Sequence, residues 1–128
     1  MAGQLPQVLA LKPRLALWTD GTSWTNWSRH EAYLRSQPKW KPHQIASVAE
    51  ESLRIISKTT PVGRPDFQCR GLVVGYVQSG KTANFTAVAA RAADVGYRLI
   101  IVLSGIHDSL RNQTQRRLNQ ELAGVGVD

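Results

Sequence analysis

The stretch RGLVVGYVQSGKTANF, residues 70–85, carries the strongest fold signal in the chain. Its residues 75–82 match G-x-x-x-x-G-K-T, the phosphate-binding P-loop, which stands between a strand and a helix. A short apolar run, 72–74, precedes the loop and is typical of a buried parallel strand. An alanine-rich helix is predicted to follow from Lys81 to about Asp94, and Gly96 ends it.

The pattern repeats once after this helix. RLIIVLS, residues 98–104, predicts a second buried strand, and residues 108–122 predict a last helix with leucines along one face. Strand, helix, strand, helix in this order predicts a right-handed parallel βαβα unit. The fold class expected for this half is therefore α/β.

The first half of the chain has a different pattern. Two helices are predicted, Arg29–Ser36, which Ser28 would cap, and a second that begins at Pro42 and runs to about Lys58. TTPVGRPDFQ, residues 59–68, is rich in turn formers and marks a boundary near residue 65. We therefore expect a helical, tryptophan-containing region over residues 1–65 and the start of a P-loop domain over residues 66–128.

The loop residues suit a triphosphate. Glycines at 75 and 80 let backbone N–H groups turn inward around the phosphates, and the helix that opens at Lys81 directs its positive end at the same anion. Lys81 would reach the β and γ phosphates, and the Thr82 hydroxyl would bind Mg²⁺.

A P-loop hydrolase also needs an acidic residue at the end of an apolar strand, to hold Mg²⁺ and position water. Asp94 and Asp108 lie outside any such strand end, and Asp128 is the last residue. We therefore expect these 128 residues to be the front part of a longer protein and, alone, to bind ATP weakly or not at all and to hydrolyse none.

Residues 70–118 resemble the start of the Z-one domain, a prokaryotic endonuclease family similar to the ATPase core of superfamily two helicases. The stretch from Tyr33 through Lys58 also resembles what precedes that motif in the family, so the resemblance covers roughly residues 33–122. The stretches VQSGKTANF and GIHDSLRNQTQ carry most of the likeness. The resemblance implies a partial RecA-like P-loop NTPase core, ATP and Mg²⁺ as cofactors, DNA as partner, and a place in restriction or phage defence.

The resemblance also implies roles for single residues. The nucleotide-binding set that it implies is Gly75, Gln78, Ser79, Gly80, Lys81 and Thr82. Arg111 and Gln113 follow the second strand and would contact nucleic-acid phosphates or the domain interior. Two alternatives remain open: a small-molecule kinase with the same loop, and a truncated, non-catalytic nucleotide-binding fragment.

Composition excludes several other classes. The net charge is +7, which favours anionic partners without choosing among them. No apolar run approaches the roughly 18 residues of a membrane span, and the single Cys69 allows no internal disulfide, so we expect a cytoplasmic protein without a membrane partner. The tryptophans at 18, 24, 27 and 40 fit core packing better than base stacking. Arg116 and Arg117 are interpreted as helix-face charges first and phosphate contacts second.

Overall fold

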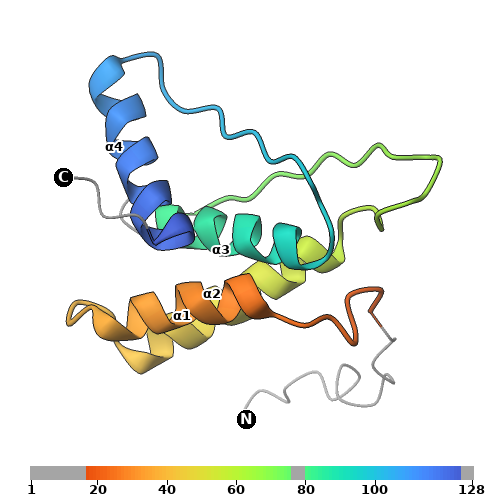
Figure 1. Ribbon diagram of the computed structural model, residues 1–128, viewed down its shortest axis with the longest axis horizontal. Helices are drawn as coiled ribbons and strands as arrows, with labels where there is room; N and C mark the ends of the chain where they lie inside the picture. The colour runs from red at the N-terminus through yellow and green to blue at the C-terminus, as the bar shows by residue number, and fades with distance from the viewer. Residues whose placement is uncertain (1–16, 76–79, 125–128) are drawn as a thin grey trace, which may run out of the picture.

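The computed structural model describes residues 17–75 and 80–124, and within them every regular element is a helix (Figure 1). The elements are α1 (Thr25–Ser36), α2 (Pro42–Ser57), α3 (Lys81–Asp94), α4 (Asp108–Leu118) and the π-helical turn η2 (Asn119–Ala123). The bounds of α2 and α3 confirm the two helices predicted there.

The α/β prediction is wrong, and with it the partial RecA-like core built on a parallel βαβα unit. Among the described residues there is no strand, and both segments expected to form one, 72–74 and 98–104, carry no regular secondary structure. Their apolar side chains face solvent, with Leu72 88% and Leu103 92% exposed. A strand needs a neighbour for its backbone hydrogen bonds and cover for its side chains, and an apolar pattern specifies neither.

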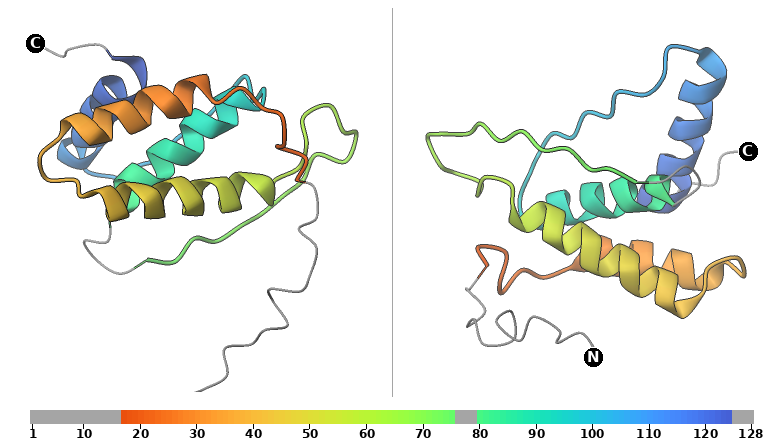
Figure 2. Two further views of the ribbon diagram at one scale, coloured as in Figure 1. Left: turned by 90° about the horizontal axis from the view of Figure 1, so that it is seen from below. Right: turned by 180° about the vertical axis from the view of Figure 1, so that it is seen from behind.

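The folded body is a helical hairpin covered by a third helix. Residues 37–41 join α1 to α2, and α3 packs against both, as the views from below and from behind show (Figure 2). The buried hydrophobic cluster contains Trp27, Leu34, Ile45, Val48, Ala83 and Ala87. Small alanine side chains on α3 allow the helices to approach closely. The cluster contains residues from both predicted regions, before and after residue 65.

Helix α1 begins four residues before the predicted start. Ser28, expected to be its cap, instead donates its hydroxyl to the Trp24 carbonyl within the helix. Asp94, at the end of α3, accepts hydrogen bonds of 2.9 and 3.0 Å from the backbone N–H groups of Asn26 and Trp27. A carboxylate from another helix therefore accepts hydrogen bonds from N–H groups that have no partner within α1. Its negative charge also interacts favourably with the positive end of the α1 dipole.

We predict that Asp94→Ala lowers the free energy of unfolding by about 1–3 kcal/mol, because it leaves two helix N–H groups without their acceptor. Chemical denaturation followed by circular dichroism measures the change. Asp108→Ala is the matched control, since that carboxylate is 81% exposed. It should cost about 0.5 kcal/mol or less. Equal losses in the two variants would contradict the capping role of Asp94.

Arg91 of α3 lies at the centre of the three-helix body and is 4% exposed. Its guanidinium carbon stands 4.6 Å from the Trp24 ring centre and 4.4 Å from that of Trp27. It donates to the Ser52 hydroxyl at 2.9 Å and to the Ala49 carbonyl at 3.1 Å. The packing interpretation of the tryptophans is thus confirmed for Trp24 and Trp27, and Trp40 also packs against the buried cluster.

The last predicted helix is present, but its apolar face is not buried. None of the residues of α4 is buried, and Leu110 is 49% exposed. The helix continues into η2, and η2 packs against α1 and α3. No helix within residues 17–75 and 80–124 is both long and apolar enough to cross a membrane.

Candidate functional site

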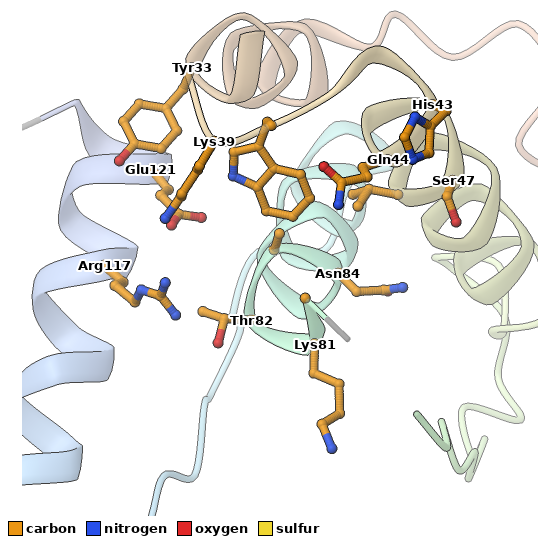
Figure 3. Close-up of a pocket in the computed structure, with 14 residues that line it drawn as sticks. Tyr33, Lys39, His43, Gln44, Ser47, Lys81, Thr82, Asn84, Arg117 and Glu121 are labelled. Carbon is orange, nitrogen blue, oxygen red and sulfur yellow. The ribbon is translucent and has the colours of Figure 1, made fainter. Parts of the chain in front are cut away.

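A pocket of about 670 Å³ opens at the N-terminal end of α3 (Figure 3). Its lining comes from the α1–α2 hairpin, the first turn of α3, and the C-terminal helices. The residues that line it are Tyr33, Lys39, Trp40, His43, Gln44, Ser47, Val48, Gly80, Lys81, Thr82, Ala83, Asn84, Arg117 and Glu121. Three of the predicted nucleotide-binding residues, Gly80, Lys81 and Thr82, therefore lie in a concave site.

Gly80 precedes α3 in a conformation that other residues rarely adopt, with φ at +75°. A Cβ atom there would lie 3.2 Å from Cη2 of Trp40, which is closer than ordinary van der Waals contact. Backbone geometry and the Trp40 ring together require glycine at this position. The absence of a side chain also leaves the start of α3 open to the pocket.

Lys81 and Thr82 form the first turn of α3. The first α-helical bond runs from the Asn84 N–H to the Gly80 carbonyl, so the N–H groups before Asn84 have no partner within the helix. Lys81 is exposed, and its Nζ donates to the Gly75 carbonyl at 3.1 Å. The ammonium group thus folds back toward the loop, and in Figure 3 it points away from the helix body.

The remaining predicted site residues are placed differently. Gln78 and Ser79 lie outside the described residues. Arg111 and Gln113 are exposed on α4 and do not line the pocket at α3. Arg111 forms an ion pair with Asp108, at 2.9 Å.

Sequence reasoning missed four residues that complete the site. Lys39 and Trp40 come from the turn between α1 and α2, Arg117 comes from α4, and Glu121 comes from η2. They are far from the P-loop in sequence, and no local spacing connects them with it. The one available signal was the basic pair at 116–117, which was interpreted first as a helix-face charge.

Glu121 is a buried carboxylate in a cationic setting. Its side chain is only 9% exposed, and among the described residues its Oε2 has no hydrogen-bond partner. Burial raises the pKa of Glu121, while the charges of Arg117 and Lys39 act in the opposite direction. In Figure 3 the Lys39 ammonium and the Glu121 carboxylate point toward each other.

Behind Glu121 stands His30 of α1, which is fully buried. Its Nδ1 lies 3.9 Å from Oε2 of Glu121, and neither ring nitrogen has a hydrogen-bond partner in the described part of the chain. Burial lowers the pKa of His30 from its ordinary value of 6.5. The folded protein therefore holds this imidazole neutral at pH 7, packed edge-on against the Trp27 ring.

We predict that the protein loses stability as the pH falls below about 6.5, because His30 takes up a proton more readily when unfolded than when buried. Glu121 contributes with the opposite sign, since its raised pKa makes the folded state the better proton acceptor above pH 4.5. Comparison of the wild type with His30→Leu between pH 7 and 5.5 isolates the His30 effect, because Glu121 is present in both proteins. Urea unfolding at these pH values should show a loss for the wild type and a smaller one for His30→Leu. The same slope in both would mean that another group is responsible.

The pocket lining includes two oxygen-bearing side chains of the kind that bind Mg²⁺ in proteins. No group of three or more His, Cys, Asp or Glu side chains that could hold a metal was found within the described ranges. The lining supplies a hydroxyl from Thr82 and a carboxylate from Glu121. That set fits Mg²⁺, which keeps several waters and takes most of its other ligands from substrate phosphates.

Comparisons of the chain with protein-family models, with curated proteins and with solved structures return no match. The resemblance to the Z-one domain therefore stays a prediction that rests on residues 70–118.

Proposed function

We propose that this protein binds a nucleoside triphosphate, ATP with Mg²⁺, in the pocket at the start of α3. The observation that carries the proposal is that Gly80, Lys81 and Thr82 of the loop motif line a pocket of about 670 Å³. A volume of this order is typical of small-molecule and cofactor sites. The open N–H groups and positive end of α3 favour a phosphate at this place.

The charges of the lining favour a polyanion. Lys39, Lys81 and Arg117 contribute three cations, whereas Glu121 is the one carboxylate among the lining residues. Since burial raises the pKa of that carboxyl group, its negative charge opposes an anionic ligand less than that of an exposed carboxylate would. A chain of phosphates could contact several of these cations at once.

Trp40 favours a nucleotide over a bare polyphosphate. Its indole is half-buried, lines the pocket, and lies against Gly80. An aromatic face beside a phosphate site can stack a base, and such stacking tolerates any base. The Gln44 side-chain oxygen accepts from the Lys41 N–H at 2.9 Å, which leaves its amide nitrogen and the His43 ring, both in the lining, to bond the edge of a base or sugar.

The wider role that we propose is that of the ATP-binding part of a DNA-directed ATPase from an endonuclease family in prokaryotic defence. This part of the proposal is supported by the resemblance of residues 70–118, by the net charge of +7, and by the exposure of Arg111 and Gln113 on α4. ATP hydrolysis by the protein that contains these residues, measured with and without duplex DNA, tests it. Stimulation by DNA supports the role, and equal rates contradict it.

The binding proposal is tested by titrating the full 128-residue chain with ATP, tripolyphosphate and adenosine, each with Mg²⁺. Isothermal titration calorimetry should show ATP binding most tightly, tripolyphosphate less tightly, and adenosine weakest. Quenching of the Trp40 fluorescence should follow the ATP isotherm, because stacking places a base on the indole. Absence of ATP binding at millimolar concentration would refute the proposal.

A further inference from the structure

Arg117 places a second cation opposite the loop motif. It is half-buried, it lines the same pocket as Lys81 and Thr82, and it projects from α4 toward the start of α3 (Figure 3). The residue before it, Arg116, is exposed and lies outside the pocket lining. Two adjacent arginines of one helix therefore face different surroundings, and only one of them faces the proposed phosphate site.

Glu121 connects the lining of the pocket with the buried His30. Its side chain is 9% exposed, and its unpartnered Oε2 lies 3.9 Å from Nδ1 of His30, away from solvent. The charges of Arg117 and Lys39 both act on this carboxyl group, which indicates that the two cations lie near it on the pocket wall. A chain of phosphates in the pocket could therefore contact both cations.

The attachment of α4 to the rest of the protein is weak. None of its residues is buried, and the packing of this region against α1 and α3 runs through η2. Hydrogen bonds within α4 are exposed to water, so they should open with little free energy. A ligand that contacts both α4 and α3 would therefore add a link where the protein itself supplies few contacts.

We propose that Arg117 is a second phosphate-binding residue and that a bound triphosphate bridges α3 to α4, with Lys81 on one side and Arg117 on the other. This inference rests on the proposed function, because it assigns a further contact to the same ligand. It predicts selectivity for phosphate-chain length, since a monophosphate held at the start of α3 could contact Lys81 without reaching Arg117. It also predicts that binding orders α4.

The test compares Arg117→Gln with its neighbour Arg116→Gln in the full chain, with ATP and AMP as ligands in Mg²⁺. Loss of one charge-assisted phosphate contact should weaken ATP binding by roughly 10- to 100-fold in Arg117→Gln. AMP affinity should change by less than about threefold in either variant, and ATP affinity should change little in Arg116→Gln. Arg117→Lys should restore part of the ATP affinity if the charge is what matters.

Hydrogen exchange gives a second readout. ATP should slow the exchange of α4 amides in the wild type and in Arg116→Gln, but not in Arg117→Gln. Equal ATP affinities in the two glutamine variants, or an equal loss for ATP and AMP in Arg117→Gln, would overturn the inference while leaving nucleotide binding intact. If the wild type bound no ATP, the proposed function itself would fail, and the bridge with it.

Discussion

Replacing Arg91 with alanine is expected to lower the free energy of unfolding by about 3–5 kcal/mol, the largest loss of any single change in the helical body. The substitution removes two hydrogen bonds, to Ser52 and Ala49, and the contacts of the guanidinium with the Trp24 and Trp27 rings. It also leaves a cavity at the point where α1, α2 and α3 meet. For a small domain this loss is a large fraction of the total stability.

Arg91 is unusual because it is a buried cation. Burial lowers the pKa of Arg91 to about 10, whereas the charges of Asp94 and Glu31 act to raise it. The group still carries its charge at pH 7, so the tryptophan rings and hydrogen bonds must stabilise a cation in place of water. Arg91→Lys keeps the charge but loses the planar fork, and should fall between wild type and alanine.

Denaturant unfolding followed by tryptophan fluorescence measures these changes. Arg54→Ala is the matched control, because this arginine is 59% exposed and pairs only with glutamates on its own helix. It should cost about 0.5 kcal/mol or less. A comparable loss in both variants would show that the site around Arg91 contributes little beyond general helix stability.

Replacing Lys81 with alanine is expected to weaken ATP binding by about 10- to 150-fold, which corresponds to the loss of one charge-assisted contact worth roughly 1.5–3 kcal/mol. Lys81 is the first residue of α3 and lines the pocket, and its ammonium group donates an exposed hydrogen bond to the Gly75 carbonyl. A phosphate could replace that carbonyl as acceptor at little cost.

The same substitution should leave the melting temperature of the ligand-free protein almost unchanged, because the Lys81 side chain is exposed. Calorimetric titration with ATP and a thermal melt without ligand measure the two effects separately. Lys58→Ala, which removes an exposed lysine beyond the end of α2, is the control for the change in net charge. Equal ATP affinity in the two variants would mean that the loop motif does not bind phosphate in this protein.

Local sequence signals located the helices well. Pro42 at the start of α2 and Gly96 after α3 act on the local backbone conformation, without help from distant residues. Both helices therefore begin and end close to the predicted residues. The start of α1 was missed because its N–H groups are capped by Asp94, a residue that follows Asn26 by 68 positions and Trp27 by 67.

The α/β prediction failed because its evidence was also local. The apolar runs at 72–74 and 99–103 have the composition of buried strands, yet their side chains are exposed in the structure. An apolar composition shows only that a segment could form a buried strand if a neighbouring strand and a covering layer were present. Among the described residues there is no such neighbouring strand.

Within the site, local sequence is enough to specify what one turn of chain can build: Gly80 with its left-handed backbone, then Lys81 and Thr82 at the open end of α3. The residues that surround this turn are set by the packing of the helices. Lys39, Trp40, Arg117 and Glu121 reach the pocket because the α1–α2 turn and the α4–η2 region come together at the start of α3. The two parts differ in the distance along the chain over which their interactions act. Backbone conformation depends on a few neighbouring residues, whereas the charge and shape of a pocket depend on packing between elements distant in sequence.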